Sequence, residues 1–260
     1  MSRDALERSL RAGRDAGRKL LLPYMTGGLG PDWPNVVQAM VSAGADAVEI
    51  GIPFSDPVVD GPTIQEASER ALGLGATPGG ILDQVKAIDV DVPLIAMTYY
   101  NIVFRFGHRR FARSLADAGV RGAIIPDVPM EEMGDWAPAA DQAQIETVLL
   151  AAPVTPDDRL EELCRRTKGF IYGVNIMGVT GERSTVARST GVLAKRLKAV
   201  TDKPVIMGFG VSTPQQAGEA AADADGVIVA SALMRVLLDG GGPDDVGELV
   251  GRIRAALDAG

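Results

Sequence analysis

Three carboxylates lie in one apolar, proline-rich stretch of the chain, VEIGIPFSDPVVDGPTIQ, which covers residues 48–65. Glu49 falls in an apolar run that predicts the end of a buried strand, where an ionised carboxylate is costly unless it is paired. Asp56 and Asp60 follow among three prolines, each of which fixes its own φ and favours extended backbone at the residue before it. The pattern predicts a stiff, irregular loop with acids at defined places.

Glu49 and Asp60 are the candidates for general acid–base chemistry. An apolar setting raises the pKa of one carboxyl while hydrogen bonds keep another ionised, and such a pair can exchange protons near neutral pH. Each residue also has a structural explanation: Glu49 as a buried carboxylate bonded to backbone amides, and Asp60-Gly61 as a turn. Asp56 is expected to stiffen the loop or to face a partner.

Short apolar runs flanked by Gly, Pro or Asp predict the strands that must position these acids. Segments with helical spacing lie between the runs, and several end at glycine, as helices often do. This alternation predicts parallel strands with crossover helices, in either a doubly wound sheet or a barrel. The eight runs are Leu20–Met25, Ala47–Ile50, Leu94–Thr98, Gly122–Pro126, Thr147–Leu150, Phe170–Val174, Pro204–Gly208 and Gly226–Val229.

The count of strand–helix units favours the barrel. Eight units in 260 residues, with no break in composition, predict a single (β/α)8 TIM-barrel domain over residues 1–260. Ala5, Leu6 and Leu10 predict an extra N-terminal helix before the first strand. The long interval after the second strand predicts one enlarged loop, which includes Gln65–Gly73. In such a barrel the active site lies at the carboxyl ends of the strands, where Glu49 and Asp60 fall.

Glycine-rich segments after the last three strands predict a phosphate site. They are GVTG at 178–181, GFGVS at 208–212 and Ala230-Ser231. Ser212 or Thr213 before Pro214 predicts a helix N-cap, whose amides and dipole favour an anion. GFGVST and VASAL contain no Lys or Arg, so a phosphate would depend on N–H groups. Tight turns are the structural alternative, and a dinucleotide site is disfavoured because the third glycine is missing.

Composition excludes several classes of function. The net charge is −8 with no basic patch, which argues against nucleic-acid binding. The apolar runs are far shorter than the roughly twenty residues that span a bilayer. The single cysteine, Cys164, cannot form an internal disulfide, so a cytoplasmic protein is expected. His108, the single histidine, is expected at a helix start on the surface, and without His or Cys clusters neither a metal nor a cofactor is expected.

The stretch EIGIPFSDPVVDGPTIQ closely resembles the signature of the tryptophan synthase α subunit family, whose members are β/α barrels. The similarity continues through LPYMTGG, MTYYNIVFRFG, IIPDVPMEE, GVTGERS, GFGVSTPQQ and ASAL, and so covers nearly the whole chain. It implies a lyase that cleaves indole-3-glycerol phosphate to indole and glyceraldehyde 3-phosphate by a retro-aldol reaction in tryptophan biosynthesis. It also implies a pyridoxal-phosphate β subunit as partner, in an α2β2 heterotetramer, that joins the indole to serine.

The resemblance also implies roles for individual residues. Glu49 would protonate indole C3 and take the glycerol hydroxyl proton, and Asp60 would stabilise positive charge at the indole N–H. Thr180 would belong to a mobile lid and bond Asp60. Tyr24, where the family usually has Phe, would lie beside the indole. The other implied contacts are the pocket tyrosines Tyr99 and Tyr172 and the phosphate-binding amides of Gly181, Gly210, Ala230 and Ser231.

Three departures from the family pattern leave the catalytic pair untouched. Ala230 stands where glycine is common, so its methyl could crowd the phosphate or resist a positive φ. VNIMGVTG lacks the usual polar residues before GVTG, and GGLGPDW replaces the usual turn after the first strand. A stand-alone lyase that releases free indole fits the same residues. A catalytically idle barrel that activates a β subunit is the third alternative, and the presence of both Glu49 and Asp60 argues against it.

Overall fold

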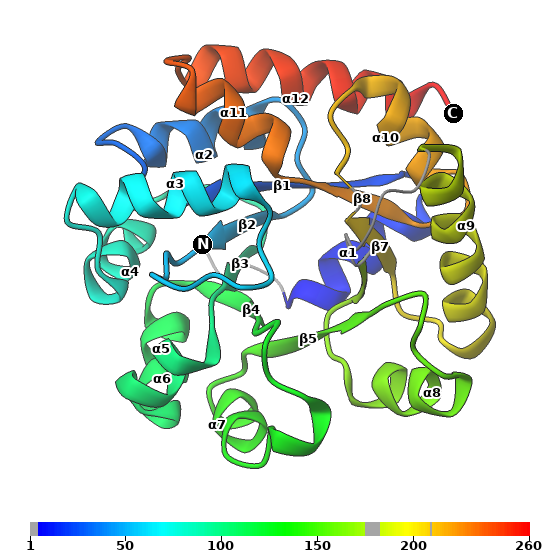
Figure 1. Cartoon of the computed structure of the whole chain (residues 1–260), viewed down its shortest axis with the longest axis horizontal. Helices are drawn as coiled ribbons and strands as arrows, with labels where there is room; N and C mark the ends of the chain where they lie inside the picture. The colour runs from blue at the N-terminus through cyan, green and yellow to red at the C-terminus, as the bar shows by residue number, and fades with distance from the viewer. Residues whose placement is uncertain (1–4, 175–182, 209) are drawn as a thin grey trace.

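The computed structural model describes residues 5–174, 183–208 and 210–260, apart from the side chains of residues 183–190. Its strands form a closed parallel barrel in chain order, in which each strand pairs with the next and the last pairs with the first (Figure 1). The strands are β1 (Leu20–Thr26), β2 (Val48–Gly51), β3 (Leu94–Met97), β4 (Val120–Ile124), β5 (Glu146–Ala151), β6 (Ile171–Val174), β7 (Val205–Gly208) and β8 (Gly226–Val229).

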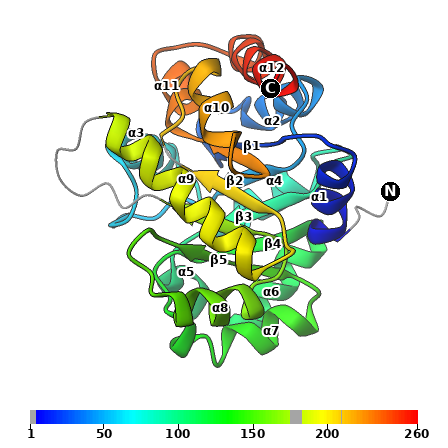
Figure 2. The ribbon, with the colours of Figure 1, turned by 90° about the vertical axis from the view of Figure 1, so that its right-hand side faces the viewer.

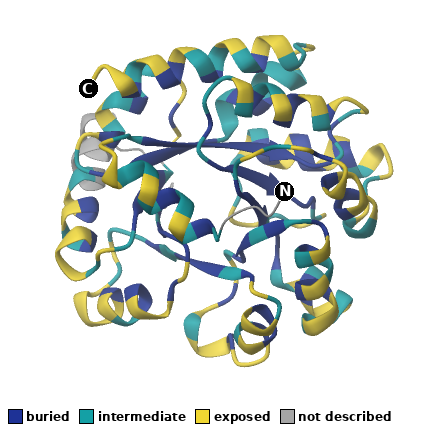
Figure 3. Cartoon of the chain, turned by 180° about the vertical axis from the view of Figure 1, so that it is seen from behind, coloured by how far each residue is buried: buried dark blue, intermediate teal, exposed yellow. Residues whose placement is uncertain are grey.

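All eight predicted strands are confirmed within two residues at either end. Helices surround the barrel, and in Figure 3 their outer faces are exposed while the strands inside them are buried. No helix within the described residues is long and apolar enough to cross a lipid bilayer. The helices are α1 (Leu6–Asp15), α2 (Trp33–Ser42), α3 (Pro62–Gly73), α4 (Pro78–Lys86), α5 (Tyr100–Phe106), α6 (His108–Asp117), α7 (Trp136–Gln142), α8 (Asp157–Arg166), α9 (Arg183–Val200), α10 (Pro214–Ala221), α11 (Ser231–Leu238) and α12 (Pro243–Asp258).

The long interval after β2 differs from the expected loop, because half of it is helical. It contains α3 and α4, and each begins with a proline in its first turn. Proline suits that position since its fixed φ matches the helix and its missing N–H would have no intrahelical partner there. Thr77 also caps α4 by accepting a hydrogen bond from the Gly80 amide at 3.2 Å. The segment before α3 is irregular, as predicted, and it carries Asp56 and Asp60.

Helix α1 lies across one end of the barrel and closes it (Figures 1 and 2). Leu6 and Leu10 of α1 are fully buried, and they pack with inward-facing strand residues in one apolar cluster inside the barrel. Gly122 and Gly169 leave room for Leu6, since a Cβ on either would lie 2.5 or 2.9 Å from its methyl group. The expected N-terminal helix is therefore confirmed, and it plugs the barrel end opposite the carboxyl ends of the strands.

Loss of this plug should destabilise the whole barrel. Leu10→Ala should lower the free energy of unfolding by about 2–5 kcal/mol, because it leaves a cavity in a cluster that the strands cannot easily close. Urea denaturation measures the change. Leu74→Ala is the matched control, because Leu74 is 62% exposed and its loss should change stability by about 0.5 kcal/mol or less. Equal effects of the two substitutions would contradict a plug.

Candidate functional site

Glu49 points into the barrel from β2 and is almost fully buried. Glu49 is 1% exposed, and its Oε2 has no hydrogen-bond partner among the residues that the structure describes. Burial raises the pKa of Glu49 to about 8, and the negative charge of Asp60 adds to the rise. Hydrogen bonding of this oxygen to backbone amides, the structural explanation, is not what the fold shows. The carboxyl group is instead held in a state where it readily keeps a proton near neutral pH.

Asp60 lies in the loop after β2, at the end of a turn in which its amide donates to the Pro57 carbonyl at 3.0 Å. The turn therefore ends at Asp60, while Gly61 lies outside it as the extended N-cap residue of α3. A position at the end of this turn does not conflict with a chemical role for Asp60. The Tyr99 hydroxyl donates a hydrogen bond to Asp60 Oδ2 at 2.9 Å. Burial raises the pKa of Asp60 to about 6, and the bond from Tyr99 limits the rise because it stabilises the ionised form.

Tyr99 is the residue that holds the acidic loop against the barrel. It lies two residues after the end of β3, is 4% exposed, and stacks on Phe54 with ring centroids 5.2 Å apart. Its hydroxyl accepts a hydrogen bond from the Val59 amide at 3.2 Å and donates one to Asp60. Two consecutive loop residues are therefore fixed by one phenol. Phe54 was not among the predicted site residues, although its position between Glu49 and Asp60 in the sequence was the available signal.

Tyr24 of β1 and Tyr172 of β6 enter the barrel interior in a repeated arrangement. Each ring lies against a glycine of the next strand: a Cβ on Gly51 would be 1.9 Å from the Tyr24 hydroxyl, and one on Gly208 would be 2.5 Å from the Tyr172 ring. Burial raises the pKa of both phenols well above the ordinary value, and the charges of Glu49 and Asp60 raise them further. Both tyrosines therefore lie within electrostatic reach of the two acids.

Three of the four predicted phosphate-binding residues, Gly210, Ala230 and Ser231, follow β7 and β8, which are neighbours in the barrel. Gly210 has φ +58°, in the left-handed region that favours glycine. Ala230 is the single residue between β8 and α11, and its φ is −120°. The expected difficulty with a positive φ therefore does not arise. Ser231 begins α11. Thr180 and Gly181, the predicted lid residues, lie outside the described residues.

The helix N-termini in this region differ in how their amides are used. At α10 the predicted N-cap is confirmed as a capping box, in which Thr213 accepts from the Gln216 amide. Gln216 Oε1 in turn accepts from the amides of Ser212 and Thr213, at 2.8 and 3.2 Å. At α11 the cap residue is Ala230, which has no side-chain acceptor to offer. The first-turn amides of α11 are therefore the better donors for an anion.

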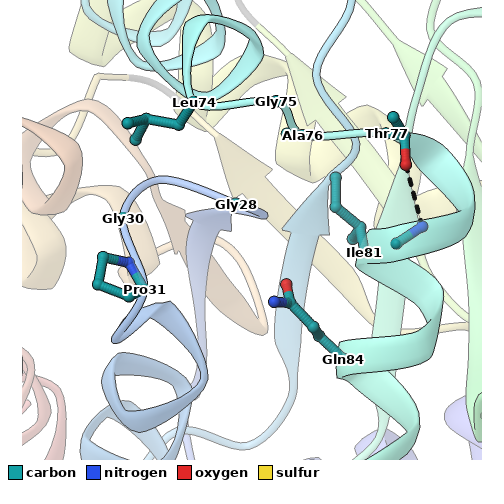
Figure 4. Close-up of a pocket in the computed structure, with 10 residues that line it drawn as sticks. Gly28, Gly30, Pro31, Leu74, Gly75, Ala76, Thr77, Ile81 and Gln84 are labelled. Atoms are coloured by element: carbon teal, nitrogen blue, oxygen red, sulfur yellow. Dashed lines mark hydrogen bonds between the residues drawn. The ribbon is translucent and has the colours of Figure 1, made fainter.

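A separate cavity of about 320 Å³ lies outside the barrel, between the loop after β1 and the α3–α4 turn (Figure 4). Its lining includes Gly28, Pro31, Ala76, Ile81 and Gln84, but none of the predicted site residues. Gln84 is engaged there by the indole N–H of Trp33, which donates to Oε1 at 2.7 Å. Among the described residues no group of three or more His, Cys, Asp or Glu side chains could hold a metal ion. The buried acids thus remain the main chemical feature.

Known proteins share this sequence and geometry. A family model described as "Tryptophan synthase alpha chain" matches residues 10–245. The alpha chain of Halorhodospira halophila is 43% identical over 252 residues, which cover 95% of this chain and 91% of that protein. The alpha chain of Methanosarcina acetivorans is 45% identical over 218 residues, which cover 84% of this chain and 79% of that protein.

Solved structures agree with the sequence relatives. A structure of Mycobacterium tuberculosis tryptophan synthase superposes with a TM-score of 0.90 at 37% identity, covering 99% of this chain and 100% of that one. The tryptophan synthase subunit alpha of Legionella pneumophila gives a TM-score of 0.89 at 30% identity, and the superposition covers 100% of this chain and 99% of that one. The chain therefore belongs to the tryptophan synthase alpha chain family.

Proposed function

We propose that this protein is the lyase component of a tryptophan synthase, and that it cleaves indole-3-glycerol phosphate to indole and glyceraldehyde 3-phosphate. The observation that carries the proposal is the buried pair of acids with separated pKa values, about 8 for Glu49 and about 6 for Asp60. Between these values Glu49 holds a proton while Asp60 is ionised. A retro-aldol cleavage needs both a proton donor and a fixed negative charge, and the pair supplies them at neutral pH.

Glu49 is assigned the proton transfers. It gives its proton to indole C3, which places a positive charge on the ring nitrogen that the Asp60 carboxylate stabilises. Glu49 then takes the proton from the glycerol hydroxyl next to C3. As that proton leaves, the bond from C3 to the glycerol carbon breaks, its electrons restore the indole ring, and the hydroxyl carbon becomes the aldehyde. Glu49 ends the cycle protonated, so no external base is consumed.

Tyr24, Tyr99 and Tyr172 are assigned to the pocket around the indole, together with the lid residue Thr180. The phosphate is assigned to the amides of Gly181, Gly210, Ala230 and Ser231. The support for this second assignment is the uncapped N-terminus of α11 beside the loop that carries Gly210. An uncapped helix terminus offers free N–H donors and the positive end of the helix dipole to an anion.

The proposal includes a β subunit as partner in an α2β2 assembly, with the cytoplasm as compartment. Three exposed apolar side chains lie on segments that follow β2, β3 and β5, on the side of the barrel where the strands end. Val58 is 79% exposed, Phe104 63% and Val154 77%. Large exposed apolar side chains on one rim are typical of a protein-binding surface. This observation favours a partnered subunit over a stand-alone lyase.

Replacement of Glu49 tests the chemistry directly. Glu49→Gln keeps the shape of the side chain but cannot transfer a proton, so turnover should fall by about 10²–10⁴-fold or more while substrate affinity stays nearly unchanged. Steady-state kinetics and calorimetric binding of the substrate measure the two effects. Asp56→Asn is the matched control, because Asp56 is an exposed acid of the same loop, and the isolated variant should keep normal turnover. Near-normal turnover of Glu49→Gln would remove Glu49 from the mechanism.

The pH dependence of kcat/KM should be bell-shaped. Activity should fall below about pH 6 as Asp60 gains a proton, and above about pH 8 as Glu49 loses one. Tyr99→Phe removes the hydrogen bond that favours ionised Asp60, so the pKa of Asp60 should rise and the acid limb should move to higher pH. An acid limb that stays in place in Tyr99→Phe would show that Asp60 is not the group that titrates there.

Substitutions of Ala230 test the phosphate assignment. Ala230→Leu should abolish calorimetric binding of glycerol phosphate, because the larger side chain would fill the space beside the first turn of α11. Ala230→Gly should leave binding unchanged and cost stability slightly, by about 0.5–1 kcal/mol, since φ is negative and glycine is not required. Full affinity of Ala230→Leu would place the phosphate elsewhere.

A further inference from the structure

Tyr24 carries a hydroxyl group on the inner face of the barrel, directly beside Glu49. The two residues are Cα partners in the parallel β1–β2 pair, so both side chains point to the same face. The Tyr24 hydroxyl lies next to Gly51, because a Cβ added to Gly51 would be only 1.9 Å from the hydroxyl oxygen. Gly51 follows Glu49 by two residues and shares its face of β2. The Tyr24 hydroxyl therefore lies along the same short stretch of strand as the Glu49 carboxyl group.

The proton of this hydroxyl is available for another acceptor. Thr26, which is fully buried, donates its own hydroxyl proton to Tyr24 Oη at 3.3 Å. That contact uses an acceptor position on Tyr24 and leaves its proton free to be donated elsewhere. Burial and the neighbouring carboxylates raise the pKa of Tyr24 well above its usual value. The phenol is thus a neutral donor throughout the pH range in which the two acids titrate.

Glu49 provides the matching acceptor. Within the described part of the chain its buried Oε2 has no hydrogen-bond partner, which is tolerable for a protonated carboxyl but costly for a carboxylate. Among the described residues, the titratable groups that interact with Glu49 are Asp60, Tyr24 and Tyr172, and Tyr99 is hydrogen-bonded to Asp60. Asp60 is itself an acid, and the Tyr99 proton is already given to Asp60. Of the two remaining phenols, only Tyr24 lies on the neighbouring strand in register with Glu49.

We propose that Tyr24 is a positioning residue, whose hydroxyl donates a hydrogen bond to Glu49 whenever Glu49 is ionised. In the proposed reaction Glu49 becomes a buried carboxylate after it protonates indole C3, and it needs a donor until it takes the glycerol hydroxyl proton. Tyr24 supplies that donor and keeps its own proton, so the proton balance of the cycle is unchanged. The role of this hydrogen bond in catalysis rests on the proposed function. The hydrogen bond itself does not, because it can be measured without substrate.

Tyr24→Phe removes this hydroxyl and keeps the ring. The pKa of Glu49 should rise by about one unit, a roughly tenfold increase in proton affinity, because a hydrogen bond to the charged form is lost. Infrared titration of the carboxyl band measures the pKa of Glu49, and the band is assigned to Glu49 by its loss in Glu49→Gln. In kinetics the alkaline limb of kcat/KM should move to higher pH by the same amount. Tyr99→Phe is the matched control, since it removes a phenol hydroxyl from the same site but should move the acid limb.

The outcomes separate this inference from the proposed function. An unchanged or lowered pKa of Glu49 in folded Tyr24→Phe would overturn it, even if the enzyme is an active lyase. A raised pKa in a chain without lyase activity would support the hydrogen bond and contradict the proposed function instead. Should Tyr24→Phe fail to fold, Thr26→Val gives the second test. Loss of the donor to Tyr24 should raise the pKa of Glu49 by a smaller amount, and no change would overturn the inference.

Discussion

The burial of one ionisable carboxyl group, that of Glu49, is the constraint on which the rest of the site depends. An isolated carboxylate in an apolar interior is so costly that the group raises its pKa and holds a proton instead. In this barrel the closed ring of strands and the α1 plug exclude water on the inner side, and Asp60 adds a negative charge on the outer side. The fold therefore creates a weak acid, and an enzyme that must protonate carbon needs such an acid near neutral pH.

Glycines at the carboxyl ends of β2 and β7 make this environment possible. Gly51 and Gly208 have no side chain where the rings of Tyr24 and Tyr172 lie, so two large aromatic groups enter the barrel at these positions. The rings exclude water from Glu49 while their hydroxyls keep polar groups near it. An alanine at Gly51 would collide with the Tyr24 hydroxyl and force that ring out of the site. The strand glycines thus shape the pocket as much as the residues that touch it.

The fold was largely predictable because periodicity and turn residues determine it, whereas the contacts between side chains were not. Eight apolar runs sufficed for the barrel, and Pro62 and Pro78 could have signalled α3 and α4 within the expected loop. Glu49 and Asp60 were identifiable as acids in an apolar, proline-rich setting. The Tyr99 bond to Asp60 joins residues 39 positions apart, and no local pattern encodes such a pairing. The capping of α10 by Gln216, which leaves α11 as the better anion site, also required the three-dimensional structure.

The lack of Lys and Arg in GFGVST and VASAL, two segments of the proposed phosphate site, is consistent with the chemistry of the acids. A lysine ammonium about 10 Å from Glu49 would interact with it by about 1.7 kcal/mol at an effective dielectric constant of about 20, enough to lower its pKa by about one unit. Such a charge would move the proton-donating state of Glu49 away from neutral pH. Backbone amides and a helix terminus bind an anion with partial charges whose influence fades within the first turn. A cradle of amides around Ala230 and Ser231 can therefore hold the phosphate while the pKa of Glu49 stays high.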